Sequence, residues 1–234
     1  MFLPLSGKNG MGRTRRMLQE KGDVMFLIGL VISDSDVFVT IGNGNGESEE
    51  FAVSPNRWKK LASAYGIGET EEPVPVDARF YDDVSHAAGA TRAVRDGAKI
   101  LSAGPKSRRE LIHKLCDRGA SRDCAEEAAD FLAKRGYLNE EKQAEALARS
   151  LLRRNRYGKL RIRAYLGSHG YTAAAVNEAL GEISPVEWRE ALTELIRRKY
   201  DPWPADPNER RKAYAALARL GYTVEEVHTV VRQT

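Results

Sequence analysis

The spacing of apolar residues changes once along the chain. Up to about residue 80 they form short runs typical of β-strands, such as the nine-residue run VMFLIGLVI at 24–32. From about Tyr81 onward they recur at intervals of three and four, as in Leu111, Ile112 and Leu115, which is the period of an amphipathic helix. The pattern predicts a mostly α protein preceded by a small β-hairpin region.

The first region is expected to contain three strands, at 24–32, 37–41 and 50–53. The last two are joined by GNGNGES at 42–48, whose glycines and asparagines tolerate the positive φ of a hairpin turn. A phosphate-binding glycine loop would need a helix after it, whereas acidic residues and a strand follow here. We therefore expect a hairpin, followed by a short helix at 58–65 and a linker at 66–77.

Capping residues mark the ends of the later helices. Four starts share a side-chain oxygen three positions before a glutamate, which is the capping-box spacing. These oxygens belong to Ser107, Ser184, Asp206 and Thr223. Four stops share a glycine, the residue that enters the left-handed conformation most easily, namely Gly119, Gly136, Gly170 and Gly221. The predicted helices cover 90–102, 107–118, 121–135, 139–156, 159–169, 172–180, 184–200, 207–220 and 223–232.

The helical region repeats with a period of 51 residues. The motif Gly-Tyr-Thr-x-x-x-Val begins at Gly170 and again at Gly221, and Gly119 holds the same position one period earlier. Three further positions keep an apolar residue at this period: Leu115, Leu166 and Leu217; Ala125, Val176 and Val227; and Ala93, Ala144 and Leu195. Repeats of this size bury their apolar faces on one another. We therefore expect an elongated tandem array of three-helix repeats.

This organisation predicts five segments. They are a disordered basic leader at 1–23, a small β-containing region at 24–80, and helical repeats at 81–136, 137–182 and 183–234. The leader and the apolar run after it superficially resemble a signal peptide. The run is nine residues, too short to span a bilayer, and Ser33-Asp34 follows it instead of a small-residue cleavage site. We therefore expect a cytoplasmic protein that does not contact a membrane.

Composition narrows the chemical possibilities. With 42% hydrophobic residues, 30% charged residues and a net charge of +4, the chain is typical of a soluble globular protein. Cys116 and Cys124 are its two cysteines, and no metal-type Cys/His spacing surrounds them, so free thiols are expected. No nucleophile elbow, zinc-binding helix or P-loop occurs, and Glu140 and Glu141 complement the dipole at a helix start. The sequence thus predicts a non-enzymatic protein without a metal or cofactor.

One segment carries charge of a single sign. Between Ala146 and Asn177 there is no Asp or Glu, but there are seven basic residues: Arg149, Arg153, Arg154, Arg156, Lys159, Arg161 and Arg163. Most charge runs are solvated helix faces. However, like charges four residues apart on a helix cost stability. Arg149 and Arg153 form such a pair, and we expect neither to have an acidic residue that relieves it. We therefore favour a binding surface for an acidic partner, either DNA phosphates or an acidic protein groove.

Three segments resemble the tandem repeats of the RecX family, the regulatory proteins of the RecA recombinase. They are KSRRELIHKLCDRG at 106–119, FLAKRGYLNEEKQAEALARSLLR at 131–153 and YGKLRIRAYLGSHGYTAAAVNEAL at 157–180. The resemblance covers about residues 90–232 and rests on the order and spacing of the motifs. The chain departs from the family at Glu140, where Asp is usual, and at Gln143, where an aromatic residue usually packs between repeats.

The resemblance implies a function. Members of this family bind in the helical groove of the RecA–DNA filament and lower its ATP hydrolysis and strand exchange. It implies a non-enzymatic modulator, mainly an inhibitor, whose partners are the RecA filament and single- or double-stranded DNA, with the seven basic residues as the contact surface. We expect a monomer. A helical-repeat DNA-binding protein and a protein-interaction scaffold, both independent of RecA, are the alternatives.

Overall fold

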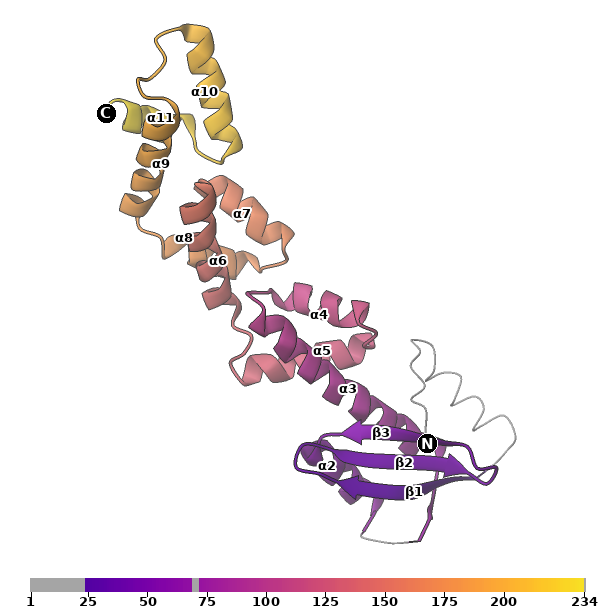
Figure 1. The fold of residues 1–234 in the computed structure, drawn as a ribbon. Coiled ribbons are helices and arrows are strands. Elements are labelled where there is room, and N and C mark those ends of the chain that lie inside the picture. Colours follow the sequence, from indigo (N-terminus) through magenta and orange to yellow (C-terminus); the bar gives the residue numbers. More distant parts are fainter. Residues whose placement is uncertain (1–23, 69–71, 234) are drawn as a thin grey trace. The chain divides into compact units, whose positions relative to one another are not determined.

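The computed structural model describes residues 24–68 and 72–233 (Figure 1). The leader predicted at 1–23 lies outside these residues. The described part forms helices α2 to α11 and strands β1 to β4, which confirms the prediction of a mostly α protein with a small N-terminal sheet. The chain divides into two compact units, one formed by Met1–Gly97 with Lys114–Phe131, and the other by Ala98–His113 with Leu132–Thr234.

The first unit contains an antiparallel sheet in the order β3-β2-β1-β4. The strands are β1 (Met25–Ile32), β2 (Val37–Asn43), β3 (Ser48–Val53) and β4 (Val74–Val76). The predicted hairpin turn lies between β2 and β3, where the Asn43 Oδ1 accepts hydrogen bonds from the backbone N–H groups of Asn45 and Glu47, at 3.1 Å each. The sequence predicts a linker where β4 forms. β4 contains Pro75 and is too short to show alternation, and it is a strand because it pairs with Met25–Leu27 far away in the sequence.

Two helices cover one face of this sheet. They are α2 (Pro55–Tyr65), drawn behind the strands in Figure 1, and the first part of α3 (Ala78–Ser102). Trp58 of α2 and Phe80 of α3 join the inward-facing strand residues in one core. The prediction that the helix after the linker begins at 90 is wrong. It begins at Ala78 because the Asp77 side chain accepts a hydrogen bond from the Phe80 N–H, at 2.8 Å.

The remaining eight helices begin and end within one residue of the predicted positions. They are α4 (Arg108–Asp117), α5 (Arg122–Lys134), α6 (Glu140–Asn155), α7 (Lys159–Ser168), α8 (Ala173–Gly181), α9 (Pro185–Lys199), α10 (Pro207–Arg219) and α11 (Val224–Val231). Ser184 and Thr223 form complete capping boxes, and all four predicted stop glycines have positive φ. Local capping chemistry therefore determines where these helices start and stop.

Equivalent positions of the repeat have equivalent environments. Leu115, Leu166 and Leu217 are each at most 1% exposed, and the apolar residues at the other two repeated positions are buried as well. In the second unit, α6, α7 and α8 enclose one apolar core and α9, α10 and α11 enclose another. Of the described helices, none is long and apolar enough to span a membrane.

Two equivalent contacts in the second unit join the start of one helix to the last turn of another. The Ser107 hydroxyl, before α4, donates to the main-chain carbonyl of His169, after α7, at 2.6 Å. One period later the Gly158 N–H, before α7, donates to the main-chain carbonyl of Leu220, after α10, at 2.7 Å. We call this arrangement the repeat joint.

An arginine completes each repeat joint. Arg109 donates to the Ser168 carbonyl at 3.0 Å, and Arg161 donates to the Arg219 carbonyl at 2.7 Å. Both joints therefore use main-chain oxygens, which are exposed at the end of a helix because they have no intrahelical partner.

Candidate functional site

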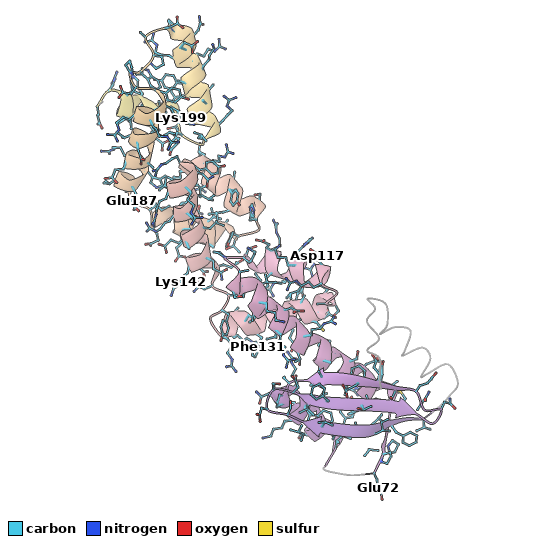
Figure 2. All side chains as sticks on the ribbon, viewed as in Figure 1. Glu72, Asp117, Phe131, Lys142, Glu187 and Lys199 are labelled. Atoms are coloured by element: carbon cyan, nitrogen blue, oxygen red, sulfur yellow. The ribbon has the colours of Figure 1, made fainter. Side chains whose placement is uncertain are left out.

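The seven basic residues of the acid-free segment lie on α6, on α7 and between these helices, all within the second unit. Figure 2 draws the side chains of the described residues and labels Lys142 on α6 and Glu187 on α9. The α6 helix starts at Asn139, whose side chain accepts a hydrogen bond from the Lys142 N–H at 2.9 Å. Arg153 and Arg154 lie in its last turn, where positive charge complements the helix dipole. The dipole of α6 therefore favours Arg153 and Arg154 at these positions even without a binding partner.

Arg149 is not an unrelieved charge. Its guanidinium contacts the carboxylate of Glu145 at 2.9 Å and that of Glu187 at 2.7 Å, and it donates to the Glu182 carbonyl at 2.8 Å. The hydrogen bond to Glu145 is the main cause of a raised Arg149 pKa. The prediction that Arg149 has no acidic relief is therefore wrong, because Glu187 comes from α9 and Glu145 lies just before the acid-free segment.

Glu187 pairs with Arg149 and also caps a helix. Its carboxylate accepts a hydrogen bond from the Ser184 N–H at 3.0 Å and so completes the capping box of α9. Hydrogen bonds from Ser184, followed by the charge of Arg149, lower the pKa of Glu187. Arg149 therefore links α6 to the first turn of α9.

Arg156 also has a structural task. It ends α6 in the left-handed conformation with φ of 54°, and among the described residues no other non-glycine residue has a positive φ. This conformation costs an L-residue about 1–2 kcal/mol. It is held by the Tyr222 hydroxyl, which donates to the Arg156 carbonyl at 3.0 Å, and by an ion pair with Glu194 at 2.7 Å.

The two arginines of α7 are engaged as well. Arg161 belongs to the repeat joint and lies over the Tyr157 ring, 4.2 Å from its centroid. Arg163 donates to the side-chain carbonyl of Asn177 on α8 at 2.8 Å. Both side chains remain exposed, but their positions are fixed by contacts inside the protein.

Three of the seven have no side-chain partner within the described residues: Arg153, Arg154 and Lys159. All three are exposed, and we call them the unpaired basic set. Arg153 and Arg154 line a hollow of about 620 Å³ along α6, together with Lys142 and the ion pair of Arg149 and Glu145. Lys142 is exposed and was missed in the sequence because it precedes the acid-free segment and follows two glutamates.

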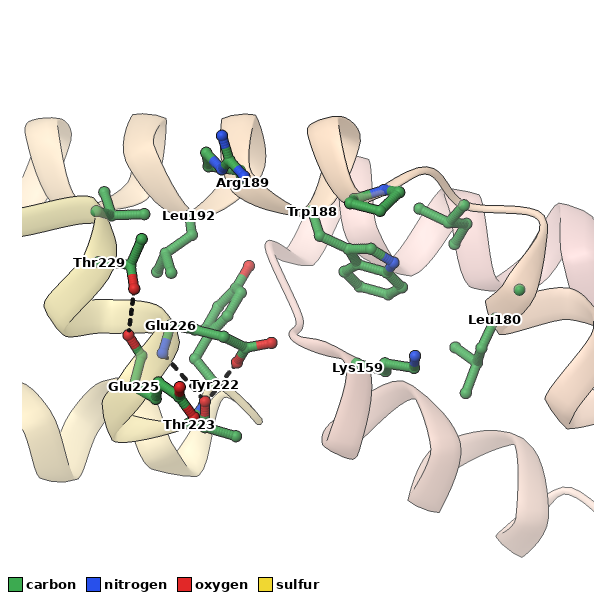
Figure 3. A pocket seen from close by; sticks show the side chains of 14 residues that line it. Lys159, Leu180, Trp188, Arg189, Leu192, Tyr222, Thr223, Glu225, Glu226 and Thr229 are labelled. Atoms are coloured by element: carbon green, nitrogen blue, oxygen red, sulfur yellow. Dashed lines mark hydrogen bonds between the residues drawn. The ribbon is translucent and has the colours of Figure 1, made fainter. Parts of the chain in front are cut away.

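Lys159 lies in a different place, at a groove of about 550 Å³ between α8 and α9 on one side and α11 on the other (Figure 3). Leu180, Leu192 and Val230 provide apolar lining, and Trp188 is the largest aromatic side chain of the groove. Sequence patterns could not reveal this groove, because its walls come from segments up to 71 residues apart, Lys159 and Val230 being its extremes.

The two departures from the family pattern have local consequences. Glu140 accepts a hydrogen bond from the Arg108 N–H at 2.7 Å and so caps the start of α4. Gln143 donates to the Tyr137 carbonyl at 3.3 Å, but its own side-chain oxygen is buried without a hydrogen-bond partner in the described structure. The first departure preserves a helix cap, and the second leaves a buried acceptor unsatisfied.

Comparison with known proteins gives a consistent set of relatives. No family model matches the chain. A protein named Regulatory protein RecX from Xanthomonas axonopodis pv. citri is 32% identical over 165 residues, which cover 70% of this chain and 96% of that protein. Proteins of the same name from Stenotrophomonas maltophilia and Chromohalobacter salexigens are 35% and 34% identical, over 54% and 56% of this chain and 77% and 86% of their own lengths.

Two solved structures share the fold. A crystal structure of regulatory protein RecX matches with a TM-score of 0.68 at 14% identity, covering 90% of this chain and all of that one. A crystal structure of RecX from Lactobacillus salivarius matches with a TM-score of 0.57 at 18% identity, covering 62% of this chain and 96% of that one.

Proposed function

This chain belongs to the RecX family, and from that premise we propose that it is a non-enzymatic regulator of the RecA recombinase. In this proposal it acts mainly as an inhibitor. It binds along the groove of the RecA–DNA filament and lowers ATP hydrolysis and strand exchange. Its partners are the RecA filament and the DNA that the filament encloses.

The unpaired basic set carries the proposal. Arg153, Arg154 and Lys159 are exposed positive charges with no partner in the described fold, so their charge is available to an acidic ligand. Phosphates of DNA and acidic protein surfaces are both such ligands, and a RecA–DNA filament offers both. Arg149 and Arg156 contribute to the fold through their ion pairs and are assigned no direct contact.

We expect the triple substitution Arg153→Ala, Arg154→Ala and Lys159→Ala to weaken inhibition of the RecA ATPase by at least tenfold. The reason is that three phosphate or carboxylate contacts are lost while no internal ion pair is broken. The measurement is RecA ATP hydrolysis on single-stranded DNA at several concentrations of this protein, with circular dichroism to verify unchanged helical content.

The chain offers a matched control. Arg197, Arg198 and Lys199 are three exposed basic residues in the last turn of α9, the counterpart of α6 in the next repeat. Changing these three to alanine alters the net charge equally, and inhibition should remain close to that of the wild type. Equal loss in both variants would mean that only total charge matters, and no loss in the first would remove the unpaired basic set from the proposal. A wild-type protein without effect on RecA would reject the function itself.

A further inference from the structure

The groove beside Trp188 combines an aromatic surface with unpaired positive charge. The half-buried Trp188 side chain packs against the core of α6–α8 and also lines the groove. Figure 3 shows its indole extending from α9 and the Lys159 side chain extending from α7 into the same space. Arg189 also lines the groove, is exposed, and has no side-chain partner among the described residues.

The acidic side chains of the groove are confined to one wall. Glu225 and Glu226 both belong to the first turn of α11, where the helix dipole favours negative charge. Glu226 is further occupied, because its carboxylate accepts a hydrogen bond from the Thr223 N–H at 2.7 Å. These charges repel a phosphate from the α11 wall, so a phosphate in the groove would lie beside Lys159 and Arg189.

The groove shares one residue with the unpaired basic set. Lys159 belongs to both, and it lies five residues after Arg154 in the chain. An extended segment of that length reaches at most about 18 Å, which is the span of a few nucleotides. This distance is short enough for one strand to place phosphates at Arg153 and Arg154 and also at Lys159, which lines the groove together with Trp188.

We propose that the Trp188 groove receives an unstacked base of single-stranded DNA, with the adjoining phosphates at Lys159 and Arg189. An indole face stacks on any base, and a flanking cation neutralises the backbone, which is how sequence-tolerant single-strand sites are built. This inference rests on the proposed function in one respect, namely that the chain contacts DNA. Double-stranded DNA is excluded from the site because its bases are stacked within the duplex.

Fluorine NMR can test the site on the intact protein. The chain has three tryptophans, so protein labelled with 5-fluorotryptophan should give three resonances, and the one missing from Trp188→Phe belongs to Trp188. We expect a single-stranded oligothymidylate to shift the Trp188 resonance and to leave those of Trp58 and Trp203 in place. A duplex of equal length and inorganic polyphosphate should bind by charge without this shift.

An affinity measurement provides an independent check. Trp188→Leu keeps an apolar side chain but removes the stacking surface, and should weaken binding of the single strand by about tenfold, the effect of one stacked base. Binding of polyphosphate should not change, and Trp188→Phe should retain most of the single-strand affinity because it keeps a ring. If Trp188→Leu fails to fold, the NMR titration of the labelled wild-type chain still decides the question.

Three results would overturn the inference. The Trp188 resonance could stay in place at a saturating single strand, it could shift equally with polyphosphate, or it could respond to RecA without DNA and not to the strand. The last result would assign the groove to a protein partner. The RecA ATPase assay separates the two proposals. Inhibition without a Trp188 shift rejects only this site, and a shift without inhibition rejects only the proposed function.

Discussion

Tyr171 and Tyr222 are equivalent residues, 51 positions apart, whose hydroxyl groups have different environments. The Tyr222 hydroxyl donates to the Arg156 carbonyl, whereas the Tyr171 hydroxyl is buried and has no hydrogen-bond partner in the described structure. Burial raises the pKa of both phenols, that of Tyr171 to about 12. A buried hydroxyl without a partner costs stability, whereas a paired one contributes to it.

We therefore expect opposite effects from removing the two hydroxyls. Tyr222→Phe should lower the free energy of unfolding by about 1 kcal/mol, because it leaves the Arg156 carbonyl unpaired. Tyr171→Phe should leave that free energy unchanged or raise it slightly. Urea denaturation at neutral pH measures both, and equal losses in the two variants would contradict the assigned environments.

Removing the Tyr171 hydroxyl should also change how stability depends on alkaline pH. A phenol whose pKa is raised on folding contributes stability that is complete below the unfolded pKa of about 10 and is lost as the pH rises toward the folded value. For Tyr171 this loss falls between pH 10 and about 12. Tyr171→Phe should therefore lose less stability across this range than the wild type, as followed by circular dichroism during alkaline titration.

At the residue scale, the sequence indicates which positions are basic but not which of them remain free. Arg149 and Arg153 lie four residues apart on one helix, and both belong to the segment without acidic residues. Nevertheless, Arg149 pairs with Glu187, 38 residues away. Arg156 adopts a backbone conformation for which glycine is the usual signal, and what holds it comes from Glu194 and Tyr222. Such partners are set by tertiary packing, which a pattern of near neighbours does not contain.

At the element scale, the helices follow from local chemistry. Caps and stop glycines lie within a few residues of the ends they determine, so α4 to α11 were predicted to within one residue. β4 was missed because the strand depends on a partner about 50 residues earlier. Two glycines show the same contrast between local and distant determinants: Gly167 lies within α7, and Gly158 is the N-cap of that helix. Gly167 has open space around it, whereas Gly158 lies against the main chain of Gly221.

Alanine at these two glycines should have opposite effects. A Cβ at Gly158 would lie 2.5 Å from the Gly221 carbonyl oxygen, so Gly158→Ala should force the repeat joint apart and destabilise by about 1–3 kcal/mol. A Cβ at Gly167 meets nothing within 4 Å, so Gly167→Ala should stabilise by about 0.5–1 kcal/mol through helix propensity. Thermal unfolding compares them. A harmless Gly158→Ala would mean that the joint does not require close backbone approach.

At the scale of the whole molecule, charge is nearly balanced. The chain has 37 Lys and Arg residues against 33 Asp and Glu residues, so its net charge of +4 gives little general attraction to DNA. Any binding to a nucleic acid therefore depends on where charges are unpaired and not on their total. The described fold engages Arg149, Arg156 and Arg161 internally and leaves Arg153, Arg154 and Lys159 to solvent.

The salt dependence of DNA binding should reveal which basic residues contact phosphates. Each phosphate neutralised on a single strand contributes about −0.7 to the slope of log affinity against log salt concentration. Replacing Arg153, Arg154 and Lys159 by alanine should thus reduce the slope by about 2, measured by fluorescence anisotropy of a labelled oligonucleotide. The Arg197, Arg198 and Lys199 variant serves as the control and should keep the wild-type slope. An equal reduction in both would indicate a diffuse charge effect.

The repeat joint has a consequence for how such a chain can evolve. At both joints the accepting groups are main-chain carbonyls, of Ser168 and His169 in one and of Arg219 and Leu220 in the other. Recognition of a carbonyl does not depend on which side chain that residue carries. A segment duplicated within its gene would therefore carry the accepting carbonyls from the outset, and only the donor groups on the neighbouring copy would have to be suitable. The copies could then diverge freely on their surfaces, one acquiring unpaired arginines while another kept its charges paired.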